Sequence, residues 1–130
     1  MATPHNFHLK ITPRPLGEEE KQVLDTLLGK SFPGVEQLRR QAQHVRVISR
    51  CRCGCRTIDL DIANRETLPL YRGEKRIAAE LQLKDRDGCP VLVLLHVERG
   101  YLRELEILRA DGQAIQTRLD IRSSGGTIQN

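Results

Sequence analysis

The segment Ile77–Arg109 constrains the fold more than any other part of the sequence, because it has the pattern of three consecutive strands joined by tight turns. Apolar residues occupy every second position from Ile77 to Leu83, as in a strand with one buried and one exposed face. Val91–Leu95 is apolar throughout, and its length and β-branched content favour a strand covered on both faces. Tyr101–Leu108 has the pattern of a third strand. The segment therefore predicts an antiparallel sheet.

The two connections within this segment support the prediction. Asp87-Gly88 and Arg99-Gly100 stand between the predicted strands, and glycine readily adopts the positive φ that a tight hairpin turn requires. In the third strand, Leu102 is out of phase with Leu105 and Ile107, so we expect a β-bulge there.

Two helices and two further strands are predicted before this segment. Helical periodicity follows Gly17 and ends at Gly29, and a second, shorter helix is expected to begin at Pro33. His44–Arg50 and Thr57–Ala63 have strand patterns. Because the helices precede a block of strands, the sequence predicts an α+β fold. Two N-terminal helices would pack on one face of an antiparallel sheet of about five strands, connected in chain order as a meander.

The length of 130 residues predicts one domain. Residues 1–15 are expected to form an extended N-terminal arm, residues 16–122 the α+β domain, and residues 123–130 a flexible C-terminal tail. Asn64–Arg76 contains a proline and a glycine and is predicted to be a loop. A weak alternation in Ile115–Ile121 predicts one edge strand.

Charge and hydropathy narrow the expected partners. The net charge of +4 is spread over a surface in which basic residues alternate with acidic ones, and the aromatic residues are few and scattered. Nucleic-acid binding is therefore not expected, because it needs a basic patch or a platform of stacking rings. The longest apolar run, Val91–Leu95, is too short to span a bilayer, and no apolar segment follows Met1. We expect a cytoplasmic protein without membrane contact.

Four cysteines are the strongest candidates for a chemical site: Cys51, Cys53, Cys55 and Cys89. A meander would bring all four to the same end of the sheet, where four thiolates could hold a tetrahedral zinc ion. Their spacing differs from the usual Cys-x-x-Cys zinc knuckle. The neighbouring arginines Arg50, Arg52 and Arg56 would favour thiolates, which suits redox chemistry as well. Structural or incidental thiols are the leading interpretation, ahead of a metal site and of redox chemistry.

The sequence contains other groups that could act as acids or bases. His44 and His96 are the candidate bases for a cysteine nucleophile, and Glu98, Glu104 and Glu106 could work as paired carboxylates if a pocket surrounded them. The simpler interpretation makes these glutamates cross-strand partners of Arg99, Arg103 and Arg109. His5 and His8 are interpreted as surface histidines. No established catalytic motif is present, so an enzyme is not the leading expectation.

Three groups of residues together resemble a known family. They are Phe32-Pro33-Gly34 with Glu36-Gln37-Leu38-Arg39 and Gln41, then Cys53-Gly54-Cys55 with Ile58-Asp59-Leu60, and then Gly100-Tyr101-Leu102 with Leu105-Glu106. This set resembles a family of small bacterial proteins of uncharacterised function, many of them from high-GC actinobacteria. The resemblance implies no activity. It implies that the last of the three groups belongs to the final strand of a sheet.

The leading functional hypothesis is a non-catalytic interaction module. Such a module would bind another protein along an exposed sheet edge, or would self-associate there. The alternative is a cysteine-centred protein that binds zinc or carries out thiol redox chemistry. No cofactor other than this zinc is expected.

Overall fold

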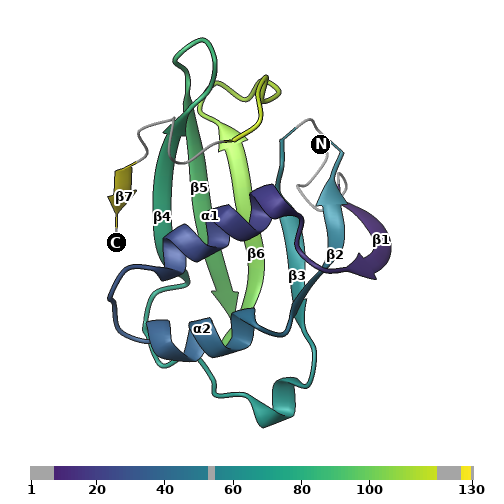
Figure 1. Ribbon diagram of the computed structural model, residues 1–130, viewed down its shortest axis with the longest axis vertical. Coiled ribbons are helices and arrows are strands. Elements are labelled where there is room, and N and C mark those ends of the chain that lie inside the picture. Colours follow the sequence, from purple (N-terminus) through teal and green to yellow (C-terminus); the bar gives the residue numbers. More distant parts are fainter. Residues whose placement is uncertain (1–7, 53–54, 120–126, 130) are drawn as a thin grey trace.

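A computed structural model describes residues 8–52, 55–119 and 127–129, and shows two helices lying across one face of an antiparallel sheet (Figure 1). The helices are α1 (Glu18–Leu28) and α2 (Val35–Ala42). The strands are β1 (His8–Arg14), β2 (Val45–Cys51), β3 (Ile58–Ile62), β4 (Ile77–Lys84), β5 (Pro90–Glu98), β6 (Tyr101–Arg109) and β7 (Thr127–Gln129), and a short 3₁₀ helix, η2, covers Arg65–Thr67. Neither α1 nor α2 is long and apolar enough to cross a membrane.

The α+β class is confirmed, and so are both helices and the five predicted strands, which correspond to β2 to β6. The predicted number of strands is too low, because β1 and β7 extend the sheet to seven strands. The N-terminal position of the helices also needs correction, since β1 precedes α1 and pairs with β2. β1 lies within the segment predicted to be an arm. Its side chains do not alternate between buried and exposed, so its sequence carries no strand pattern.

The predicted meander is wrong. The strand order is β1-β2-β3-β6-β5-β4-β7, and β3 pairs with β6 through Ile58 opposite Leu105. The reason is the long connection between β3 and β4, residues 63–76, which carries the chain past the ends of β6 and β5 before β4 begins. The hairpins β4–β5 and β5–β6 then lead the chain back, so the last strand of the series lies next to β3.

The core lies between the helices and the sheet. Val23, Leu24 and Leu27 of α1 are at most 1% exposed, as the helical periodicity predicts. Gly17 caps α1, and its N–H donates to the Glu20 carboxylate over 2.7 Å. The sheet contributes alternate residues of its central strands, such as Leu95 of β5. Each such leucine contributes about 1.5–3 kcal/mol to the free energy of unfolding.

The second face of the sheet carries no helix among the described residues (Figure 1). Leu92 and Leu94 of β5 lie on that face and are only half-buried, so β5 is not covered on both faces as predicted. The predicted bulge is confirmed, because the register between β5 and β6 shifts after His96. Arg99 and Gly100 both have positive φ, as the predicted turn requires.

The C-terminal segment differs from the prediction. Residues 115–119 form no strand, although Ile115 and Leu119 are buried. Ile121 lies outside the described residues. The strand at this edge of the sheet is β7, which pairs with β4.

Candidate functional site

The predicted cysteine site is only partly within the described residues, since Cys53 lies outside them. Cys51 ends β2, Cys55 precedes β3 and Cys89 precedes β5, so these three lie at the same end of the sheet, as predicted. β3 and β6 separate the strands of Cys51 and Cys89, which corresponds to a distance of about 14 Å at the usual strand spacing. Among the described residues, no group of three or more His, Cys, Asp or Glu side chains is placed to hold a metal ion.

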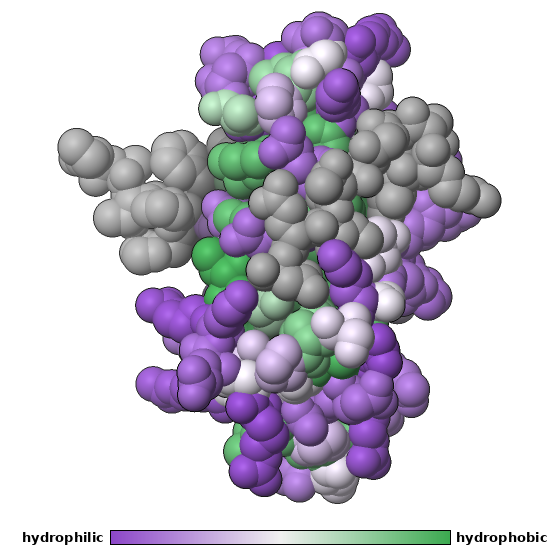
Figure 2. All heavy atoms as spheres, turned by 90° about the vertical axis from the view of Figure 1, so that its left-hand side faces the viewer, coloured by the Kyte–Doolittle hydropathy of each residue, from purple (hydrophilic) through white to green (hydrophobic). Residues whose placement is uncertain are grey.

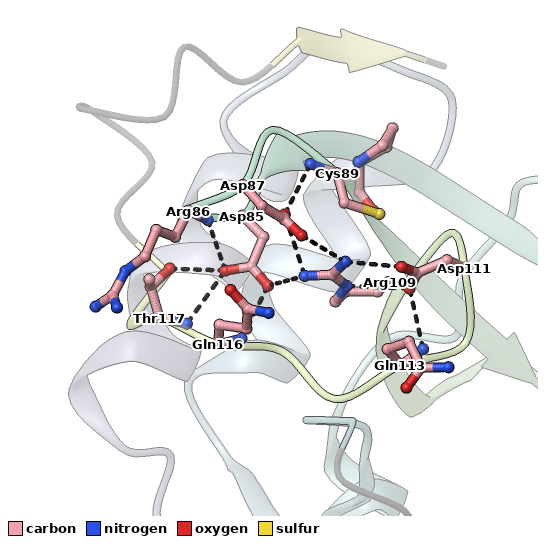
Figure 3. Close-up of polar contacts among 10 residues, drawn as sticks. Asp85, Arg86, Asp87, Cys89, Arg109, Asp111, Gln113, Gln116 and Thr117 are labelled. Atoms are coloured by element: carbon pink, nitrogen blue, oxygen red, sulfur yellow. Dashed lines mark hydrogen bonds and ion pairs between the residues drawn. The ribbon is translucent and has the colours of Figure 1, made fainter.

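Cys89 belongs instead to a turn that is built around Arg109 (Figure 3). The Arg109 side chain is 4% exposed and pairs with Asp85 at 2.9 Å, Asp87 at 2.9 Å and Asp111 at 2.7 Å. The three carboxylates accept hydrogen bonds from Nε, Nη1 and Nη2 of the guanidinium. Arg109 therefore anchors the turns at this end of the sheet, and the prediction that it is a cross-strand partner of the glutamates is wrong.

Asp85 carries this network into the C-terminal segment. Its carboxylate accepts hydrogen bonds from the backbone N–H groups of Gln116 and Thr117. Burial alone would raise the pKa of Asp85, but the hydrogen bonds from Gln116, Arg86, Arg109 and Thr117 outweigh it and hold the pKa well below its usual range. This region is fully bonded within the described chain, and we interpret it as structural.

The two histidines proposed as bases for a cysteine lie far from their candidate nucleophiles. His44 precedes β2 and Cys51 ends it, and His96 is separated from Cys89 by most of β5. At about 3.3 Å per residue, each pair is about 20 Å apart along its strand. The cross-strand neighbour of Cys51 is His8, for which the sequence predicts a surface position. His8 is half-buried, and its Nδ1 lies 2.7 Å from Oδ2 of Asp59.

The three glutamates have different partners. Glu98 pairs with Arg103 at 3.2 Å, which confirms one of the predicted cross-strand pairs. Glu106 accepts from His96 over 2.8 Å. Glu104 forms no ion pair with any described residue, and it lines a pocket on the open face of the sheet.

The outer edge of β4 is the best candidate for contact with another chain. β7 pairs with it at Glu80–Gln82, and no other described strand lies on that side. The outer edge on either side of this pairing, at Ile77–Ala79 and at Leu83–Lys84, is therefore left without a strand from the described chain, although Ala78 and Ala79 are buried. Sheet edges of this kind readily accept a further strand through backbone hydrogen bonds.

A pocket of about 350 Å³ adjoins this part of β4. Its lining is mainly apolar and comes from the loop before α2, the loop before β4, and β4 itself: Phe32, Pro33, Tyr71, Arg72, Gly73, Glu74, Lys75 and Ala78. This edge of the sheet is on the side of the molecule that faces the viewer in Figure 2, where hydrophobic residues show among hydrophilic ones.

Tyr71 forms the wall of this pocket, and two glycines make room for it. A Cβ atom on Gly34, which has φ +92°, would come within 2.5 Å of the Tyr71 ring, and one on Gly73 would come within 2.1 Å of the Tyr71 hydroxyl. Burial raises the pKa of Tyr71, although the N–H of Lys75 donates to its hydroxyl. No signal in the sequence marked Tyr71 as a site residue, whereas Phe32, Pro33 and Gly34 belong to the first group of the family resemblance.

Gln41 of α2 holds the loop that carries Tyr71. Its fully buried side chain donates to the carbonyl oxygens of Pro69 and Gly100, at 2.9 and 2.8 Å, and accepts from the N–H of Leu102 at 2.9 Å. One side chain therefore connects a helix, the pocket loop and the β5–β6 turn.

The opposite edge of the sheet is less suited to contact with another strand. β1 places Lys10 and Pro13 in exposed positions, and its register with β2 shifts between Lys10 and Arg14. Lysine, proline and irregular pairing are the features with which sheet edges avoid association.

A family model described as "Domain of unknown function (DUF6984)" matches residues 13–119. This range includes both helices and strands β2 to β6. No curated protein and no solved structure matches the chain at a significant level.

Proposed function

Because the chain belongs to the DUF6984 family, which is described only by its unknown function, we propose a function from the surface of the fold itself. The protein is a non-catalytic interaction module that binds an extended segment of another protein along the outer edge of β4. The observation that carries this proposal is the apolar pocket beside Ile77–Ala79, a stretch of β4 that β7 does not pair with and in which Ala78 and Ala79 are buried.

The edge supplies the affinity that does not depend on side chains. β7 already pairs with β4 in antiparallel register, with Gln129 opposite Glu80. A partner strand beside Ile77–Ala79 would pair in the same antiparallel sense, next to the register shift that β4 has with β5 between Ile77 and Ala79, and backbone hydrogen bonds would hold it there.

The pocket supplies the selectivity. Phe32 and Tyr71 offer apolar surface for one anchoring side chain, aromatic or branched aliphatic. Arg72 and Lys75 line the same pocket, are exposed, and form no ion pair with any described residue. The partner segment therefore carries an apolar anchor with an acidic residue beside it.

The test is a selection of random peptides displayed on phage, followed by titration calorimetry with the enriched sequences. We expect enriched peptides to share an apolar residue next to Asp or Glu. Lys75→Glu and Phe32→Ala should each weaken their binding by about tenfold, which corresponds to about 1.4 kcal/mol. Lys84→Glu is the matched control, because Lys84 is an exposed lysine on the same strand that does not line the pocket.

Two results would contradict the proposal. One is a selection in which no sequence is enriched. The other is a set of peptides that bind the Lys75→Glu and Phe32→Ala variants as tightly as the wild type. Circular dichroism of each variant would establish that the fold is kept.

The cysteine-centred hypothesis remains a second proposal. It is favoured by the placement of Cys51 and Cys55 in the connection between β2 and β3, whereas β3 and β6 separate Cys89 from Cys51 by more than one metal ion can bridge. Zinc would be bound in stoichiometric amount by protein purified without chelator, and replacement of the four cysteines by serine would abolish it. Elemental analysis that finds no zinc would exclude the metal form of this hypothesis. An interaction module would keep its peptide binding after the same replacements.

A further inference from the structure

A row of polar side chains crosses the face of the sheet that carries no described helix. Strand pairing places Ser49 of β2 opposite Asp59 of β3, Asp59 opposite Glu104 of β6, and Glu104 opposite His96 of β5. Two carboxylates thus face each other directly on neighbouring strands. Like charges in this position destabilise a sheet unless a positive group lies between them.

The carboxylate of Asp59 is already fixed by its neighbours. Its Oδ2 accepts a hydrogen bond from the Ser49 hydroxyl and lies 2.7 Å from Nδ1 of His8. The Asp59 side chain is 14% exposed. These contacts hold Oδ2 of Asp59 in place, and no described residue donates a hydrogen bond to its Oδ1.

Glu104 has no such support. No hydrogen bond or ion pair joins its carboxylate to another described residue, although the side chain is half-buried. Burial raises the pKa of Glu104, and the negative charges of Asp59 and Glu106 raise it further, while His96 and His8 act in the opposite direction. A cationic group placed between Asp59 and Glu104 would relieve this repulsion.

A pocket of about 290 Å³ lies over these carboxylates, and it contains a positive group as well. Its charged and titratable lining residues are Arg76, Arg103, His8, His96, Asp59, Glu98 and Glu104. Arg103 is paired with Glu98, whereas Arg76 forms no ion pair within the described part of the chain. The pocket is therefore lined by the carboxylate of Glu104 and the guanidinium of Arg76, which do not pair with each other.

We propose that this pocket binds a small zwitterion of the α-amino-acid class. The ligand's ammonium group lies between Asp59 and Glu104, and its carboxylate group pairs with the guanidinium of Arg76. A simple cation would leave Arg76 without a partner, and a simple anion would meet two carboxylates. The site is separate from the proposed peptide-binding edge of β4 and lies on the uncovered face of the sheet, so it adds a small-molecule ligand to the proposed function.

The first test uses free L-amino acids, each titrated into the full-length protein by calorimetry at concentrations up to about 10 mM, a range that detects Kd values near 1 mM. At least one amino acid should bind with one site per chain. Its N-acetyl derivative, which has no ammonium group, and its carboxamide, which has no carboxylate group, should each bind at least about tenfold more weakly. The proposal is overturned if no amino acid binds, or if either derivative binds as tightly as the parent.

The second test locates the site. Glu104→Gln and Arg76→Gln should each weaken binding of that amino acid by about tenfold or more. Glu80→Gln and Arg86→Gln are the matched controls. Glu80 is a half-buried glutamate on the same face, Arg86 is an exposed arginine in the β4–β5 turn, and neither lines the pocket. Equal losses in the control variants would overturn the assignment, and the ligand series stands independently if a variant fails to fold.

Discussion

Asp85 shows how much one side chain can hold together, because its carboxylate accepts hydrogen bonds from Arg86, Arg109, Gln116 and Thr117. The side chain is fully buried. Arg109 carries the balancing charge, and Asp87 and Asp111 complete its surroundings. The turn after β4 and the segment after β6 therefore depend on the same ion pair.

We expect Asp85→Asn to lower the free energy of unfolding by about 1.5–3 kcal/mol, because the buried carboxylate that accepts these hydrogen bonds is lost while Asp87 and Asp111 still balance the charge of Arg109. Urea denaturation followed by circular dichroism measures this change. Asp25→Asn is the control, since Asp25 forms an exposed pair with Lys21 on α1 and should change the free energy by about 0.5 kcal/mol or less. Similar losses in the two variants would refute the structural role of Asp85.

The His96–Glu106 pair predicts a pH dependence. The hydrogen bond to Glu106 raises the pKa of His96 above the ordinary value of 6.5, and the same bond lowers the pKa of Glu106. Because the folded state binds the histidine proton more tightly than the unfolded chain, the pair stabilises the fold fully below the ordinary pKa of histidine. This stabilisation is lost as the pH rises through the raised pKa of the folded state.

A double-mutant cycle with His96→Gln and Glu106→Gln measures the coupling between the two side chains. The coupling free energy should be larger at about pH 5.5, where both groups are charged, than at about pH 9, where the imidazole is neutral. A coupling that does not change between these two pH values would show that protonation of His96 contributes nothing to the pair.

At the level of elements, α2 is held to the sheet by a polar contact as well as by its apolar face. Gln41 satisfies three backbone groups that no other described side chain reaches. We expect Gln41→Leu to lower the free energy of unfolding by about 2–4 kcal/mol, because the Pro69 carbonyl and the Leu102 N–H lose their partner, while the Gly100 carbonyl keeps the N–H of Tyr71. Thermal and urea denaturation would measure it.

The control for this variant is Gln43→Leu, which replaces an exposed glutamine at the end of the same helix. It should change the free energy of unfolding by about 0.5 kcal/mol or less. If Gln41→Leu is as stable as this control, then the pocket loop does not depend on Gln41.

The elements that could be predicted are those whose pattern is local. The buried face of α1 follows from the spacing of Val23, Leu24 and Leu27. β4 follows from the alternation of Ala79, Leu81 and Leu83, while a register shift between Ile77 and Ala79 breaks the pattern at its start. β1 could not be found in this way, because an edge strand exposed along most of its length has no alternating pattern. The burial of Gln41 could not be predicted either, since its three partners lie far along the chain.

At the scale of the whole molecule, the sheet order depends on a pairing between distant segments. Nothing in the sequence of β3 or β6 indicates that Ile58 lies opposite Leu105, because both strands would also fit a meander. The row of Ser49, Asp59, Glu104 and His96 arises from this order, so it could not be foreseen. The cysteine positions were less affected, because both topologies place Cys51, Cys55 and Cys89 at the same end.

The two edges and the two faces of the sheet differ in how far they are open to another molecule. The helices cover one face of the sheet, β1 carries edge-protecting residues, and β7 covers only part of β4 (Figure 1). Among the described strands, the free part of β4 beside the pocket of Phe32 and Tyr71 is the position best suited to an added strand. We therefore expect the partner segment to bind along this part of β4.

The most direct measurement is a nuclear magnetic resonance study of the protein with a peptide from the selection, in which contacts between the two backbones are observed. We expect cross-strand contacts between the peptide and Ile77–Ala79, together with contacts from its apolar side chain to Phe32 and Tyr71. Contacts to β1, or to the open face around Glu104, would contradict the proposed binding edge.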